Sequence, residues 1–283
     1  MHVVPIFFLF SAGSMSSQLN RIGEKMRIKI KYIQISLLTS VILYGHSVQA
    51  NKIPEELRDF NHRTYNALPL SAEADLELNK NGNLNKFLED ATPVAEKYNL
   101  SDSIGFRLLH RHEILEEGKV MVESFGHWRE LPAFITTPEK EDTPKTYPAS
   151  WAYDTSGLKV FEFSTDPEVK KVAKQLGVHR GFFEEMKEVL VKHQLEKILA
   201  PAVLLRNSFV HFDRTQPLYE IIESQPYTSV LINKSQEELD QESEKGKKLI
   251  RTTWPLGTNN PNETICAVSC STEKSMHVYE EHK

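Results

Sequence analysis

The sequence predicts an α+β fold in a single globular domain: antiparallel hairpins that form a sheet, with one or two amphipathic helices packed on it. Two hairpin-like stretches rich in β-favouring residues come before two long segments with helical periodicity. Strands and helices grouped in this way are typical of α+β proteins. The chain has 283 residues, 40% of them hydrophobic and 26% charged, which suffices for one such domain.

Three pairs of strands are expected. The first hairpin joins residues 106–115 to 120–125, and the second joins 150–153 to 158–163 across a turn at Asp154-Thr155-Ser156-Gly157. Between them, the proline-rich and charged stretch from Thr136 to Pro148 is predicted to be a surface loop. The closing strands are expected at 249–254 and 264–270.

Helices are predicted where apolar residues recur every three or four positions. Residues 84–98 show this spacing, although Pro93 is expected to interrupt the helix and Thr92 could cap a second short one. Asp166-Pro167 is typical of a helix start. The longest amphipathic segment begins at Phe182, is expected to stop at Pro201, and should pack on the sheet.

Residues 26–50 match a secretory signal peptide. A basic start is followed by a short apolar run over residues 33–44, and Val48 and Ala50 occupy the −3 and −1 positions of a signal peptidase site. The apolar run is too short to cross a bilayer as a helix, which takes about 20 residues. The domain is therefore expected to span residues 51–283, in a secreted or periplasmic protein.

Residues 1–25 are interpreted as an upstream extension, with Met26 as the true start; the alternative is one long signal peptide. Residues 1–50 hold five of the 34 basic and one of the 39 acidic side chains, so cleavage leaves 29 basic against 38 acidic, a net charge of −9. Such an acidic chain is not expected to bind nucleic acid. No later apolar stretch is long enough to span a membrane.

The first candidate site is the run His110-Arg111-His112. On a strand, the two histidines would face the same side, with Leu109 on the other, and could share a zinc ion or another divalent metal. Glu116, in the following turn, could add a carboxylate ligand. The alternative is a strand with two half-exposed histidines and no ligand.

The same stretch resembles a segment shared by a set of uncharacterised proteins. The resemblance lies in the pattern G-x-x-L-L-H-R-H at residues 105–112, followed by Leu115, Gly118 and Val122-Glu123. It implies that the histidine pair belongs to a recurring pattern, and it implies no activity. His-x-His followed by Glu116 also partly resembles the first metal motif of cupins, although the glycine expected after the glutamate is displaced and no second motif follows.

The second candidate site lies at the end of the chain. Two thiolates and two imidazoles would suffice for a tetrahedral zinc site. In an exported protein, the two cysteines could instead form a disulfide, but on a straight strand their Cα atoms would lie about 13 Å apart, beyond the roughly 4.4–6.8 Å that a disulfide spans. Free thiols are the third possibility. The four residues are Cys266, Cys270, His277 and His282.

The sequence limits the possible functions only broadly. The sequence contains no glycine-rich phosphate loop, no G-x-S-x-G and no H-E-x-x-H. The leading expectation is an exported protein of unknown activity that binds a divalent metal. The alternatives are a secreted interaction protein without catalysis, whose protein or small-molecule partner is unknown, and a cupin-like metal-dependent enzyme.

Overall fold

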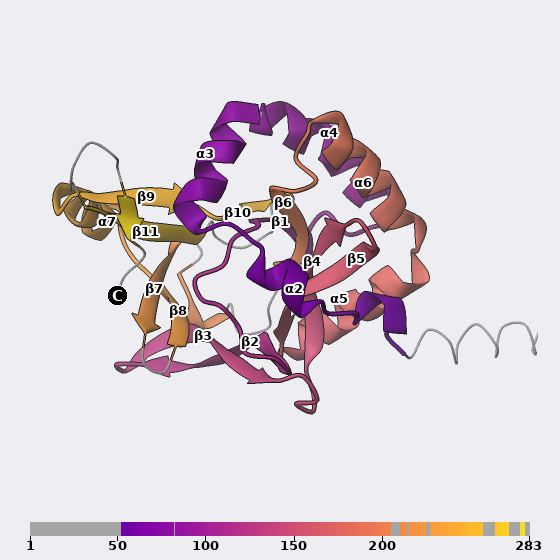
Figure 1. The fold of residues 1–283 in the computed structure, drawn as a ribbon, viewed down its shortest axis with the longest axis horizontal. Coiled ribbons are helices and arrows are strands. Elements are labelled where there is room, and N and C mark those ends of the chain that lie inside the picture. Colours follow the sequence, from indigo (N-terminus) through magenta and orange to yellow (C-terminus); the bar gives the residue numbers. More distant parts are fainter. Residues whose placement is uncertain are drawn as a thin grey trace, which may run out of the picture. The chain divides into compact units, whose positions relative to one another are not determined.

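A computed structural model of the chain describes residues 52–81, 83–204, 210–213, 215–224, 227–256, 264–271 and 278–280 (Figure 1). For the last two stretches only the backbone is considered. These residues belong to one compact unit, Lys52–Lys283. The signal peptide predicted at 26–50 and the extension at 1–25 lie outside the described residues.

The described part of the chain is α+β, as the sequence predicts. The helices are η1 (Glu55–Leu57), α2 (His62–Asn66), α3 (Ser71–Asn81), α4 (Leu84–Lys97), α5 (Pro167–Val178), α6 (Gly181–Lys192) and α7 (Gln236–Glu244). The strands are β1 (Ile104–Leu108), β2 (Lys119–Trp128), β3 (Leu131–Lys140), β4 (Tyr147–Asp154), β5 (Gly157–Ser164), β6 (Leu199–Val203), β7 (Leu218–Ser224), β8 (Tyr227–Asn233), β9 (Lys247–Arg251), β10 (Thr253–Pro255), β11 (Thr264–Ser271) and β12 (Val278–Glu280).

All twelve of these strands belong to one curled sheet. Its order is β10-β1-β6-β4-β5-β2-β3-β8-β7-β11-β12, with β9 also paired to β11. The pairs β2–β5 and β7–β11 are parallel, and the other pairings are antiparallel. Only Thr252 separates β9, which pairs with β11, from β10, which pairs with β1. This single extended segment therefore links the two ends of the sheet, which curls around an interior (Figure 1).

Helices cover the outer face of the sheet near β1, β6 and β4. Helix α4 packs against α6, and α5 packs against β4 and β6 (Figure 1). Phe87 of α4 meets Phe106 of β1 with ring centroids 4.6 Å apart, and Trp151 of β4 meets Phe183 of α6 at 5.2 Å. Burying each large apolar side chain contributes about 1.5–3 kcal/mol, so this layer forms the main core.

The opposite face of the strands points into the interior. On β8, Val230 and Ile232 pack outward, whereas Ser229 and Leu231 line an internal cavity. On β1, Phe106 lies in the helix-covered core, and the next residue, Arg107, lines the same cavity. The period-two alternation of strands thus separates an apolar outer face from a polar inner one.

The first predicted hairpin is wrong in its pairing. Strand β1 ends at Leu108 and lies between β6 and β10, while residues 109–118 form a loop. Strand β2 instead pairs with β3, across a tight turn in which Arg129 and Glu130 have φ of 49° and 69°. Residues 136–140, predicted to lie in a surface loop, belong to β3. Strand-like residue patterns do not select the partner strand, and here non-local packing decided it.

Two helix boundaries also differ from those predicted. Helix α4 continues through Pro93, because Phe87, Ala91 and Ala95 are fully buried and their packing outweighs the hydrogen bond that proline removes. Helix α6 ends at Lys192, before a left-handed residue at Gln194 with φ of 60°. The residues around Pro201 form strand β6, which pairs with β1 and β4.

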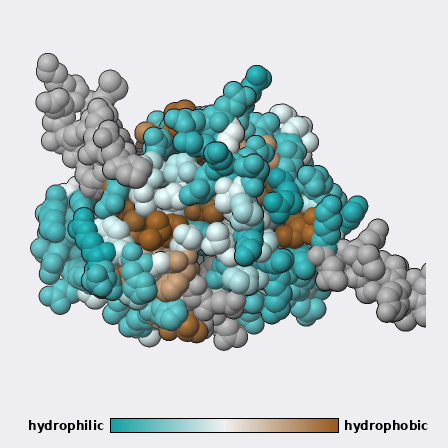
Figure 2. All heavy atoms as spheres, turned by 90° about the horizontal axis from the view of Figure 1, so that it is seen from below, coloured by the Kyte–Doolittle hydropathy of each residue, from teal (hydrophilic) through white to brown (hydrophobic). Residues whose placement is uncertain are grey.

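Other predicted elements are confirmed. Strands β4 and β5 form the second hairpin, and the Asp166 side chain caps α5 by accepting a hydrogen bond from Glu168 N. The two closing segments are strands β9–β10 and β11. Within the described stretches, no helix combines the length and apolar character needed to cross a bilayer. In Figure 2 the visible face is mainly hydrophilic, with hydrophobic side chains in small separate patches.

Gly105 should be needed for closure of the sheet, because β1 is squeezed between its neighbours there. A Cβ atom at this position would lie 2.4 Å from Trp254 O and 2.4 Å from Leu204 Cδ1. We expect Gly105→Ala to lower the free energy of unfolding by about 1–3 kcal/mol in urea denaturation. Gly126→Ala in β2 is the control, since its closest contact is a side-chain methyl at 3.1 Å. Equal stability of the two variants would contradict the close approach at Gly105.

Candidate metal centre

His110 and His112 lie in the loop that follows β1, not on a strand. The fold nevertheless turns both rings to one side, as the sequence predicted, with ring centroids 4.6 Å apart. Leu109, which precedes His110, is buried in a separate apolar cluster with Leu115 and Met121. The common direction of the histidines therefore comes from the loop conformation and the burial of Leu109, and not from strand alternation.

The histidine pair meets a carboxylate from the other half of the sheet, Glu220 of β7. His110 Nε2 lies 3.0 Å from His112 Nε2, and His112 Nε2 lies 3.3 Å from Glu220 Oε1. One ligand atom from each residue falls within 4.8 Å of the other two. In a tetrahedral zinc site with bonds of about 2.0–2.1 Å, ligand atoms lie about 3.3 Å apart. These three residues could therefore hold a metal ion.

Neighbouring groups orient two of the three ligands. His110 Nδ1 lies 2.9 Å from Leu108 O, and because a carbonyl oxygen only accepts, Nδ1 must carry the proton. The lone pair of neutral His110 is then on Nε2, which faces His112. The Ser229 hydroxyl on the adjacent strand β8 donates a hydrogen bond to Glu220 Oε1. Support of this kind is typical of metal ligands in proteins.

Glu220 is held in its charged form. Burial alone would raise the pKa of this carboxyl group, but the positive charge that His112 and His110 carry when protonated, and the hydrogen bond from Ser229, keep the pKa well below its ordinary value. Glu220 therefore presents a carboxylate, the form that binds metal ions, to the two imidazoles.

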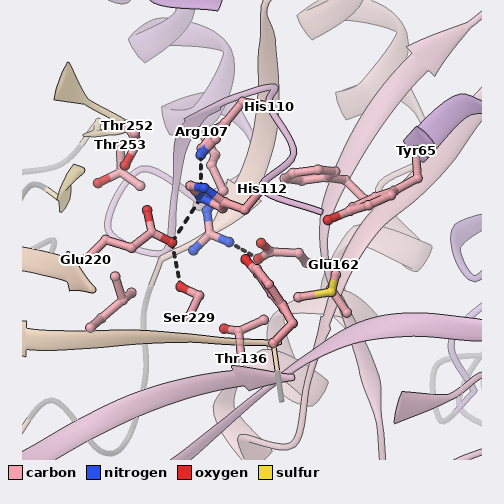
Figure 3. Close-up of a pocket in the computed structure, with 14 residues that line it drawn as sticks. Tyr65, Arg107, His110, His112, Thr136, Glu162, Glu220, Ser229, Thr252 and Thr253 are labelled. Carbon is pink, nitrogen blue, oxygen red and sulfur yellow. Dashed lines mark hydrogen bonds and ion pairs between the residues drawn. The ribbon is translucent and has the colours of Figure 1, made fainter. Parts of the chain in front are cut away.

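The three residues line a small cavity inside the curled sheet, about 30 Å³ in volume (Figure 3). Its walls come from α2, β1, β2, β3, β5, β7, β8 and the segment that closes the sheet. The remaining lining residues are Tyr65, Arg107, Met121, Thr136, Phe161, Glu162, Tyr227, Ser229, Leu231, Thr252 and Thr253.

Arg107 brings further charge to this interior. Its guanidinium forms an ion pair with Glu162 of β5, and its Nη2 lies 3.9 Å from Glu123 Oε2 of β2. The Glu123 carboxylate also accepts a hydrogen bond from the Ser164 hydroxyl. One guanidinium and three carboxylates, counting Glu220, give this cluster a formal charge of −2 when the histidines are neutral. Charges in such an environment are costly to bury unless they are compensated.

Glu116, the carboxylate expected to complete the site, lies elsewhere. Its side chain is 77% exposed and pairs with Lys119 at 2.7 Å, an interaction that lowers the pKa of Glu116. Glu220 occupies the ligand position expected for Glu116. Sequence reasoning missed Glu220 because it lies 108 positions after His112, and because β7 carries two glutamates, Glu220 and Glu223, that nothing in the local pattern distinguishes.

Little of the C-terminal cluster can be placed. Cys266 and Cys270 both lie on β11, as the sequence predicted, and the strand keeps their Cα atoms about 13 Å apart, too far for a disulfide between them. Their side chains, His277 and His282 lie outside the described residues. The geometry of a zinc site there is therefore not described.

Comparison of the chain with known proteins finds no matching family model, no matching curated protein and no matching solved structure. Metal binding is therefore inferred from the geometry of the site alone.

Arg107 should be essential for stability, because removing it leaves Glu123 and Glu162 without their cation. We expect Arg107→Ala to lower the free energy of unfolding by about 3–5 kcal/mol. The matched control is Arg180→Ala, since Arg180 makes an exposed ion pair with Glu56 and its loss should cost about 0–1 kcal/mol. Chemical denaturation of both variants tests this, and equal costs would refute the argument.

Proposed function

We propose that this protein binds one divalent metal ion, with zinc the best match, through His110, His112 and Glu220. The observation that carries the proposal is the spacing of the three ligand atoms: the two separations, 3.0 and 3.3 Å, are close to the roughly 3.3 Å between ligand atoms of a tetrahedral zinc ion. Two imidazoles and a carboxylate are also a frequent ligand set for zinc and iron.

The charge of the interior supports the same conclusion. A divalent cation would neutralise the formal charge of −2 carried by Arg107, Glu123, Glu162 and Glu220. An exposed acidic cluster would give weaker support, because water and salt would screen it. Here the side chains of Glu123 and Glu220 are only 5% and 10% exposed, so compensation by a bound ion matters more.

Metal analysis of the purified protein tests the proposal. We expect about one equivalent of zinc after loading and dialysis, and nearly none in His110→Ala or Glu220→Gln. Zinc affinity should fall as the pH is lowered, because protons compete for the imidazole nitrogens. His127→Ala is the control: this histidine is exposed on β2, away from the cavity, and its loss should leave zinc binding unchanged.

Two results would contradict the proposal. Wild-type protein that retains no zinc, cobalt or iron would mean that the short contacts form only a hydrogen-bonded chain, which favours an interaction protein without a metal. Metal retained in His110→Ala but lost in Cys266→Ser would place the site at the C-terminal cysteines instead.

We also propose that the protein is exported and that signal peptidase cleaves after Ala50. This rests on the sequence pattern of residues 26–50. In support, the first described helix begins at Glu55, so cleavage would remove none of the described helices or strands. Sequencing the N-terminus of exported protein should give Asn51 as the first residue. Material that still begins upstream of Met26 would contradict the prediction.

A further inference from the structure

We propose that the metal held by His110, His112 and Glu220 keeps a coordination position open to the cavity, and that this position takes only a small inorganic ligand, such as water, hydroxide or a triatomic anion. Organic molecules of ordinary metabolite size would then be too large to reach the metal. This inference rests on the proposed function and adds the ligand class of the site.

With three protein ligands, a tetrahedral metal ion has one coordination position left for a further ligand. Structural zinc sites are closed by four protein ligands, whereas sites with three protein ligands hold a water or substrate in the fourth position. The cluster brings together one ligand atom from each of three residues. The cavity that these residues line is where a fourth ligand would lie (Figure 3).

The size of the cavity limits that ligand. A cavity of about 30 Å³ holds two or three water-sized groups, since one water requires about 10–15 Å³ on this scale. The metal ion itself would occupy the space among the three ligand atoms. What remains suits a ligand of at most about three heavy atoms.

The walls are fixed by packing and hydrogen bonds. Tyr65 of α2 stacks on Phe161 of β5 with ring centroids 5.6 Å apart. Helix α2 is itself attached at its middle and at its C-terminal end: Thr64 Oγ1 donates to Asp154 at 2.9 Å, and the Asn66 amide bonds to both the N–H and the carbonyl oxygen of Leu115. These bonds hold the helix, and with it Tyr65, against the cavity.

The lining suits a small polar ligand. Thr252 and Thr253 are each 2% exposed and line the cavity from the segment that closes the sheet. Together with Ser229 and Arg107 they make the wall around His112 and Glu220 polar (Figure 3). Leu231 and Met121 supply apolar wall elsewhere.

The test uses the full-length protein loaded with Co²⁺, whose visible absorption reports ligand exchange at the metal. Azide has three heavy atoms in a line, whereas imidazole is a five-membered ring that binds free cobalt ions well. We expect azide to shift the cobalt absorption bands and imidazole to leave them unchanged at concentrations where both would bind an accessible ion.

Enlarging the cavity should change this selectivity. Leu231→Ala removes part of the wall and should allow imidazole to shift the bands. Ile232→Ala is the matched control, because Ile232 is the next residue of β8, is similarly buried and faces outward. Met121→Ala, which enlarges the cavity from β2, should admit imidazole as well and serves if Leu231→Ala does not fold.

Each of the remaining outcomes would refute one part of the proposal. Imidazole shifting the bands of the wild-type protein, or azide failing to shift them, refutes the inference while leaving metal binding intact. Cavity variants that still exclude imidazole refute the role of the wall. Failure of the wild-type protein to bind cobalt, zinc or iron refutes the proposed function itself.

Discussion

The segment Lys247–Pro255 determines the architecture, because it pairs with β11 through β9 and with β1 through β10. A sheet of this length would otherwise leave unpaired edges near both positions, and exposed edges invite association with other chains. Joining them curls the sheet and creates an interior. The close approach of Gly105 to Trp254 O shows how tightly β1 and β10 are drawn together.

An enclosed interior determines what its side chains must do. Strand alternation sends every second residue inward, and here those positions include Arg107, Glu123 and Glu220. Buried ion pairs gain little net stability, because desolvation cancels much of the attraction. An apolar interior of the same volume would often be as stable. The excess of buried carboxylates therefore supports the proposal that a cation binds here.

The histidines are held by parts of the chain distant in sequence. Leu109 N donates to Ile198 O and Arg111 N donates to Pro69 O, which anchors the loop on either side of His110. Asn66 of α2 anchors the same loop at Leu115. These bonds fix the backbone that carries both imidazoles, and fixed ligands lose less entropy when they bind an ion. A metal joining His112 to Glu220 would in turn tie the two halves of the sheet together.

The sequence by itself determined the fold class, the β4–β5 hairpin, the Asp166 cap of α5 and the closing strands. Each of these depends on residues close together in the chain, whose propensities and spacing act locally. Tertiary structure alone decided the partners of β1, the passage of α4 through Pro93, the strand at Pro201 and the choice of Glu220 over Glu116. These depend on which distant surfaces pack together, and Glu220 reaches the histidines only because the sheet curls.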